Sequence, residues 1–521
     1  MISPYNKTTE SPRAYFIQRG YAYVVAETRG TGSSEGVWDF GSDRERRDGY
    51  EQVEWVARQR WSSGAVGMIG DSYRGINQWW TAMEQPPHLK AIIPINPPAD
   101  MYRTGGAAGG ELSSLVVAQS LVYVLGLPPG GPAMADPRRG AYIASSRPIG
   151  LGLAGTGTSN ILVGGAQSFD SPYYHRRSGY WNADRIKVPT FVIGGWFDIA
   201  QRDTQYMYEE LDKRGVPVQL LMGPWFHTGF GADLPTPPSG GLPYTLDQLA
   251  LRWFDRWVLG RADRAPDPMA PVTYHRLAEG RYQRTTSWPP ADVHYRRVYL
   301  GGPAAPGAPG SLSERAPTGA SSADALPWHP ASGACARSSR QAALGLIPET
   351  PCDSDGAAND LTGLAYDLPA AKVERHFAGP IAARLFVSTT RSDAFVDVRV
   401  ELVAPDGSVV ALTDGVDTLS FRALDKQRSL VRDGMVVRPF HPYTRSSVQA
   451  IESGTVYEWS IEILPTAASI PAGHRLRVTI QPSDAGQAVM VGERAAAMPA
   501  NVLQLHHGAE HPSSIAVPWQ K

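Results

Sequence analysis

Apolar and polar positions follow two different rhythms along the 521-residue chain, one in each half. In the first third, short apolar segments at 21–28, 65–70 and 89–95 alternate with segments of helical period. Residues 43–60 place their apolar side chains on one helical face, and residues 76–83 continue a second helix. This β-α-β-α-β order predicts a parallel sheet with helices on its faces.

The rhythm breaks between about 101 and 185, where glycine and proline clusters make the sequence turn-rich. It then resumes with apolar strand-like segments at 188–195 and 216–223, and with amphipathic helical segments at 201–214 and 245–260. We therefore expect an α/β core that is split in the sequence by an inserted cap.

The second half changes character from about residue 290. Residues 301–345 are rich in Gly, Pro, Ala and Ser, a composition typical of linkers. After residue 380, several short segments alternate apolar with polar positions, and Asp406 and Gly407 form a hairpin-turn signal. This pattern predicts a β-sandwich. The expected domains are the two parts of the core at 1–100 and 186–290, the insertion at 101–185 and the sandwich at 291–521.

Composition and charge argue against several classes of partner. The formal net charge is -1, and no Lys/Arg cluster exceeds a few residues, so we expect no binding to nucleic acid. The RERR run at 44–47 is interrupted by Glu45 and is interpreted as a solvated helix start. No stretch of about 18 apolar residues exists, so we expect no membrane span. The N-terminal residues lack the pattern of a signal peptide.

The two cysteines, Cys335 and Cys352, lie in a turn-rich stretch. A disulfide that closes a loop of about 15 residues contributes about 3 kcal/mol in the chain-entropy model. It would indicate a secreted or periplasmic protein, whereas two free thiols would fit the cytoplasm. The CDSD run at 352–355 could bind calcium, but we expect turn chemistry there and predict no metal site.

The segment GMIGDSYRGINQWW (67–80) carries the first candidate for chemistry. Ser72 follows a short buried strand and precedes a helix, as a nucleophile must if it is to project from a sharp strand–turn–helix. Gly70 lies two residues before the serine and Gly75 three after it, while Arg74 occupies the usual position of the second glycine. The alternative is an ordinary helix N-cap serine.

Asp198 and His227 complete a candidate catalytic triad with Ser72. Asp198 follows the strand at 188–195 and His227 follows the strand at 216–223. The order Ser, Asp, His along the chain is that of α/β-hydrolases, and parallel strands bring their carboxyl ends to one edge of a sheet. Taken singly, Asp198 could be a helix cap and His227 a loop histidine.

These motifs together resemble the cocaine-esterase and X-Pro dipeptidyl-peptidase family of serine hydrolases. The resemblance rests on GMIGDSYRG, GGWFD, GPWFH, ETRGTGSSEG at 27–36 and AGHRLRVTI at 472–480, with a further block at 171–181. It covers essentially the whole chain. It implies an α/β-hydrolase core with an inserted, mostly helical cap and a C-terminal jelly roll, and it implies no cofactor. The family elbow has its second glycine at the position of Gly75.

The resemblance also implies the oxyanion donors. The family uses a tyrosine hydroxyl from a segment like SPYNK, which assigns Tyr5 to this role, and the second donor is the backbone N–H of Tyr73. Family members have further strands before this tyrosine. The expectations are therefore a truncated sequence, a mis-assigned start or a sheet without its first strands.

The substrate is the least constrained prediction. Trp196 and Trp225 flank the triad and are the candidate substrate-binding residues. Glu111 is a candidate for holding a substrate ammonium group, but no acidic cluster stands out near it. We therefore expect hydrolysis of small esters or amides. The alternatives are an X-Pro dipeptidyl-peptidase or α-amino-acid ester hydrolase, an acyltransferase, or a non-catalytic binding protein. A homodimer is a candidate assembly.

Overall fold

The structure, a computed structural model, describes residues 1–5, 7, 10, 13–114, 141, 159–234, 242–261 and 270–521. The described chain divides into two compact units. The first comprises Met1–Gly105 and Ser171–Tyr274, and the second comprises 106–114, 161–170 and 275–521. Most of the expected cap insertion lies outside the described residues.

A parallel sheet forms the centre of the first unit. Its strands are β3 (Val66–Asp71), β4 (Leu89–Ile95), β7 (Thr190–Gly195) and β8 (Val218–Gly223), in the order β8-β7-β4-β3. All neighbouring pairs are parallel, and β8 also pairs in parallel with β9 (Val272–Arg276). The predicted strands at 65–70, 89–95, 188–195 and 216–223 are confirmed.

The strand predicted over 21–28 is much shorter than expected. Only β2 (Ala26–Glu27) forms, and it pairs in parallel with β1 (Ile2–Ser3) in a separate two-stranded sheet. The prediction was therefore wrong in length and in partner. The apolar residues before Ala26 instead line a cavity of about 250 Å³ together with residues of β3 and the helices beside it.

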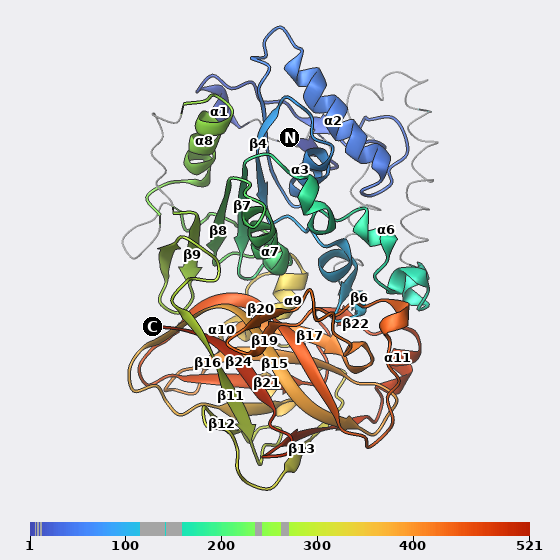
Figure 1. The fold of residues 1–521 in the computed structure, drawn as a ribbon, viewed down its shortest axis with the longest axis vertical. Coiled ribbons are helices and arrows are strands. Elements are labelled where there is room, and N and C mark those ends of the chain that lie inside the picture. Colours follow the sequence, from blue (N-terminus) through green and yellow to red (C-terminus); the bar gives the residue numbers. More distant parts are fainter. Residues whose placement is uncertain are drawn as a thin grey trace. The chain divides into compact units, whose positions relative to one another are not determined.

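The longer helices of the described chain beside the sheet are α2 (Asp43–Ala57), α3 (Tyr73–Met83), α7 (Gln201–Asp212) and α8 (Leu246–Trp257). The Ser42 hydroxyl caps α2 by accepting a hydrogen bond from the Glu45 N–H. Thr245 and Gln248 form a capping box at the start of α8. In Figure 1, α8 and the short α1 (Ala14–Ile17) lie on one side of the sheet, and α2 and α3 lie on the other.

Shorter elements complete the first unit. They are a π-helical turn at Met101–Gly106, α6 (Pro172–His175) and a 3₁₀ segment at Tyr180–Arg185.

The second unit is rich in antiparallel strands (Figure 1). Its large sheet has eleven strands in the order β13-β23-β15-β24-β11-β12-β14-β21-β16-β17, with β20 paired to β15. Only the β12–β14 pair is parallel among the described pairs of this sheet. The strands are β11 (Val293–Gly301), β12 (Gly310–Ser313), β13 (Ser322–Pro327), β14 (Leu364–Asp367), β15 (Arg375–Thr389), β16 (Phe395–Val403), β17 (Val409–Thr418), β20 (Tyr457–Ile470), β21 (Arg475–Gln481), β23 (Val502–His507) and β24 (Ser514–Gln520).

The second unit also contains smaller elements outside this sheet. The remaining strands and helices are β5 (Ala107–Ala108), β6 (Glu111–Ser113), β10 (Arg281–Thr285), β18 (Leu430–Arg432), β19 (Met435–Arg438), β22 (Ala488–Val489), α9 (Arg337–Ala342), α10 (Pro351–Ser354) and α11 (Gly492–Ala497). Short 3₁₀ turns lie at Ala166–Ser168, Ala357–Leu361, Leu419–Phe421 and Arg445–Ser447.

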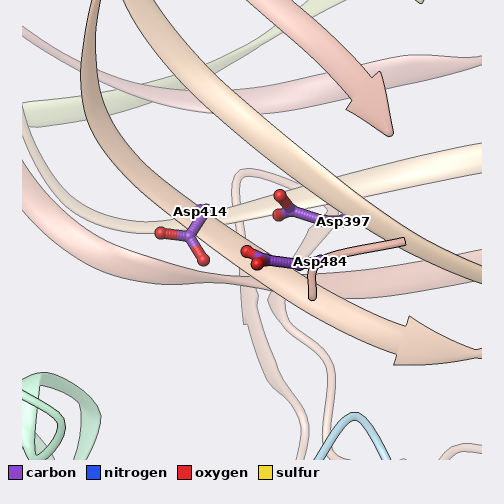
Figure 2. A group of neighbouring side chains, drawn as sticks. All are labelled: Asp397, Asp414 and Asp484. Atoms are coloured by element: carbon purple, nitrogen blue, oxygen red, sulfur yellow. The ribbon is translucent and has the colours of Figure 1, made fainter. Parts of the chain in front are cut away.

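A buried ion network lies beside β16 in the second unit. Figure 2 shows the carboxylates of Asp397, Asp414 and Asp484, each with an oxygen within 4.8 Å of the others. The Arg399 guanidinium donates to Asp397 at 2.5 Å and to Asp484 at 3.3 Å, so a protein cation already stands among these carboxylates. Burial, with the charge of Asp484, raises the pKa of Asp414 to about 6.

Cys335 and Cys352 lie at disulfide distance, with 5.1 Å between their Cα atoms. The first three residues of the CDSD run lie in the short helix α10, and Asp353 accepts hydrogen bonds from the N–H and hydroxyl of Thr350 in a capping box at the start of this helix. None of the helices in the described part of the chain is both long and apolar enough for a membrane span.

Candidate active site

Ser72 stands on a sharp turn between β3 and α3. Its backbone has φ 54° and ψ −126°, a conformation that a residue with a Cβ rarely adopts. Such a conformation costs about 1–3 kcal/mol and persists only where the surroundings fix it. Here the Ser72 N–H donates to the Ile95 carbonyl at 3.0 Å, and the N–H groups of Gly75 and Ile76 donate to the Ser72 carbonyl. The turn therefore has the strained backbone of a nucleophile elbow.

The two glycines of the motif allow the helix to approach the sheet. A Cβ on Gly70 would lie 2.6 Å from the Cβ of Arg74, which is closer than real Cβ contacts allow. A Cβ on Gly75 would lie 3.1 Å from both the Ile95 carbonyl oxygen and the Cβ of Pro97. The crowded positions are therefore two before and three after the serine. The side chain at position 74 fits because Gly70 has no Cβ to meet it.

Asp198 and His227 form the second part of the site at the carboxyl ends of β7 and β8. His227 Nδ1 lies 2.6 Å from Asp198 Oδ2, and both side chains are buried. The other carboxylate oxygen of Asp198 accepts the Ala200 N–H at 2.6 Å, just before α7 begins. Asp198 thus orients the histidine and also satisfies a backbone donor at the helix start. The Asn96 amide donates to the His227 carbonyl at 3.2 Å and fixes the histidine loop.

The charges around His227 favour its protonated form more than an aqueous environment would. Burial alone lowers the pKa of His227, but the charge and hydrogen bond of Asp198, with the charge of Asp71, outweigh it. The pKa of His227 therefore lies above its ordinary value. His227 and Ser72 are not hydrogen-bonded to each other in this conformation of the described chain. Such bonds often tighten only when substrate is bound.

Tyr5 reaches the same turn from the N-terminal segment. Its hydroxyl oxygen lies 3.3 Å from Ser72 Oγ and within hydrogen-bonding reach of the Tyr73 N–H. Burial raises the pKa of the Tyr5 phenol, against the opposing effects of Ser72 and Arg74. The phenol therefore keeps its proton at neutral pH. The structure brings together the two groups expected to bind an oxyanion.

The two tryptophans predicted to bind substrate are buried. Trp196 is fully buried, and Trp225 is only 4% exposed, with its indole N–H donating to Asp233 at 2.6 Å. Their role in substrate binding stays a prediction. Glu111 is buried in the second unit, where it pairs with Arg494 and accepts the Val491 N–H at 3.1 Å. Its charge is therefore engaged within that unit.

One buried network beside the site was missed from the sequence. The Tyr73 hydroxyl donates to Glu45 at 2.7 Å and accepts the Trp38 indole N–H at 2.9 Å. Glu45 and Arg46 are only 5% and 8% exposed, so the interpretation of the RERR run as a solvated helix start was wrong for these two residues, while Arg44 and Arg47 are exposed and α2 does begin there. Burial raises the pKa of Glu45 to about 8. A glutamate in the first turn of a helix gives no sequence signal that distinguishes this role from capping.

Comparisons with known proteins show which proteins the chain is similar to. Residues 1–229 match the family described as X-Pro dipeptidyl-peptidase (S15 family), and residues 265–516 match the X-Pro dipeptidyl-peptidase C-terminal non-catalytic domain. Cocaine esterase from a Rhodococcus species is 27% identical over 541 residues, which cover 96% of this chain and 89% of the esterase.

Two solved structures share the α/β fold. An aminopeptidase from a marine sediment archaeon, Thaumarchaeota archaeon, aligns with a TM-score of 0.75 and 19% identity over 100% of this chain and 92% of its own. An α-amino acid ester hydrolase aligns with a TM-score of 0.74 and 18% identity over 100% of this chain and 92% of its own.

Proposed function

The chain belongs to the X-Pro dipeptidyl-peptidase (S15) family of serine hydrolases, and we propose that Ser72, His227 and Asp198 are its catalytic triad. The observation that carries this proposal is a single geometry. A strained serine lies 3.3 Å from a buried phenol, and a buried Asp–His pair with a 2.6 Å contact follows the neighbouring strands. The reaction is acyl transfer to water through a covalent intermediate.

In the first step, His227 removes the proton of Ser72 Oγ as that oxygen attacks the substrate carbonyl. Asp198 accepts the Nδ1–H of His227 and stabilises the imidazolium that forms. The Tyr5 hydroxyl and the Tyr73 N–H donate to the oxyanion of the tetrahedral intermediate. Because this charge develops only in the transition state, two fixed donors lower the barrier rather than the ground state.

The intermediate collapses when the bond to the leaving group breaks and His227 gives its proton to that group. Water then attacks the acyl-Ser72 ester, and His227 takes a proton from the water as general base. Collapse of the second intermediate releases the acid and returns the proton to Ser72. Apart from the substrate and water, these steps use only side chains and backbone groups of this chain.

We propose small carboxylic esters as the substrates, with amides as a slower class. Cocaine esterase, a relative that aligns over most of both chains, supports an ester. A dipeptidyl-peptidase or amino-acid ester hydrolase needs a carboxylate for the substrate ammonium group. Glu111, the residue considered for that role, is paired with Arg494. This pairing favours substrates without a free amino group.

A substrate panel tests the proposal. Purified protein should hydrolyse p-nitrophenyl esters of short acids faster, in kcat/KM, than aminoacyl esters or Xaa-Pro anilides. The Ser72→Ala variant is the matched blank for each substrate. A preference for Xaa-Pro anilides would support the dipeptidyl-peptidase alternative. Product analysis with an added alcohol or amine would reveal acyl transfer to an acceptor other than water.

The finer architecture and the compartment belong to the same proposal. We propose that the second unit is a jelly roll. The helical cap expected at 101–185 stays a prediction, because most of it lies outside the described residues and because β5 and β6 are strands of the second unit. A disulfide between Cys335 and Cys352 would fit a secreted or periplasmic protein. The small-molecule substrate needs no protein partner, and a homodimer remains the candidate assembly.

A further inference from the structure

We propose that the Glu10–Arg74 ion pair is a clamp that positions Tyr5 as the oxyanion donor. This inference rests on the proposed function, since it assigns a task to residues around the same site. Arg74 stands two residues after the nucleophile, in the first turn of α3. Glu10 lies on the N-terminal segment that carries Tyr5. The clamp therefore joins the two parts of the chain that supply the nucleophile and one oxyanion donor.

The contacts run without a break from the helix to the tyrosine. Arg74 donates to Glu10 Oε2 at 2.6 Å, and the Ser3 hydroxyl donates to Glu10 Oε1 at 2.5 Å. The Tyr5 N–H in turn donates to Ser3 Oγ at 3.2 Å. The Arg74 guanidinium also lies 5.3 Å from the centre of the Tyr5 ring, a cation–π distance.

The position of the clamp makes it stronger than an ordinary surface ion pair. The side chains of Arg74 and Glu10 are 20% and 10% exposed, so solvent screens them only in part. Asp71 holds the other side of the Arg74 guanidinium at 2.8 Å and fixes its orientation. A guanidinium held by two carboxylates has a preferred direction that a single flexible pair lacks.

The N-terminal segment needs such a clamp because its other contacts with the rest of the first unit lie away from the Tyr5 hydroxyl. The β1–β2 pairing holds only Ile2 and Ser3, and Lys7 is held by Glu27 at 2.9 Å. Both attach the segment to the chain around Glu27. The Asn77 amide of α3 also donates to the Ile2 carbonyl at 3.3 Å, three residues before Tyr5. The Glu10–Arg74 pair attaches the segment to the first turn of α3, beside Ser72, and therefore controls the distance between the Tyr5 hydroxyl and Ser72.

A double-mutant cycle in the full chain tests this inference. Glu10→Gln keeps the size of the side chain and removes its charge. We expect kcat for a p-nitrophenyl ester to fall about three- to tenfold with KM changed less than about twofold, because the donor acts mainly in the transition state. In a Tyr5→Phe background, Glu10→Gln should cause no further loss. Arg74→Gln should behave like Glu10→Gln, and Arg74→Lys should recover part of the rate.

The controls separate positioning from folding and from failure of the proposed function. Glu210→Gln removes a carboxylate from the Arg214 ion pair on α7 and should leave kcat unchanged. Melting temperatures identify any variant that loses its fold. The clamp is refuted, while the triad stands, if Glu10→Gln lowers kcat by the same factor in the wild-type background and in the Tyr5→Phe background. It is also refuted if Glu10→Gln leaves kcat unchanged in the wild-type background. If Ser72→Ala stays active, or Tyr5→Phe matches wild type, the proposed site is refuted and the clamp with it.

Discussion

Gly70→Ala should damage both stability and catalysis, because it changes one atom at the point where α3 meets the sheet. The added Cβ would lie 2.6 Å from the Cβ of Arg74, and 3.3 Å from the Arg74 carbonyl oxygen. The first contact is with a Cβ, which cannot move unless the helix backbone moves. Gly70 itself does not have a positive φ, so alanine meets no conformational barrier of its own there. The effect is therefore purely steric.

The magnitude follows from this contact. Overpacking of a close-packed region typically costs about 1–3 kcal/mol. For a domain of 150–250 residues, each kcal/mol lowers the melting temperature by about 2–4 °C. The helix can relieve the contact only if its first turn, which begins directly after Ser72, moves away. A displacement of about 1 Å at a reacting group can cost about 10²-fold in rate. We expect a loss of that order in kcat with a small change in KM.

Calorimetry and steady-state kinetics on an ester substrate measure the two effects. Gly105→Ala is the matched control in the same unit. A Cβ at that position has no neighbour closer than the Met101 sulfur at 3.9 Å, and the residue is not at positive φ. The reasoning is refuted if Gly70→Ala has the melting temperature and kcat of this control.

Three further predictions test the site and the second unit. Ser72→Ala should abolish turnover and fluorophosphonate labelling while the fold persists, since triad residues act as a unit; turnover above a few per cent would indicate another nucleophile. The value of kcat/KM should rise with pH through an apparent pKa above about 6.5. His227 must be neutral to accept a proton, and Asp198 raises the pKa of His227. A flat profile between pH 5 and 8 would contradict a histidine base. Mass mapping under non-reducing conditions should find Cys335 linked to Cys352, and reduction should lower the unfolding free energy by about 3 kcal/mol; two alkylatable thiols in protein made under oxidising conditions would disprove the link.

The positions of the three proposed triad residues at strand ends could be predicted because they depend on local order along the chain. Ser72, Asp198 and His227 each follow a short apolar strand, and parallel strands place such residues at one edge. The spacing of Gly70 and Gly75 was visible in the sequence. Its steric cause required the coordinates, because the crowding comes from Arg74 on the helix and from the end of β4.

Other features depend on contacts between distant parts of the chain. The burial of Glu45 follows from its contact with the Tyr73 hydroxyl, 28 positions later, and a helical pattern alone gave the opposite interpretation. The shortening of the strand predicted at 21–28 depends on the pairing of Ala26 with Ile2. Tyr5 could be assigned only through the family resemblance, since its position relative to Ser72 is set by long-range pairing.

The buried ion network has a consequence for how the second unit folds. Along β16, Val396, Val398 and Val400 alternate with the charged residues of the network, and the whole strand is buried. A shift of its pairing by one residue would exchange the two faces and place Arg399 among apolar side chains without its carboxylates. An unpaired buried charge costs about 3–5 kcal/mol, in addition to the hydrophobic contacts that the shift would lose. The charges therefore act against misregistered pairings in a sheet whose strands come from distant parts of the sequence, and they help to select one alignment during folding.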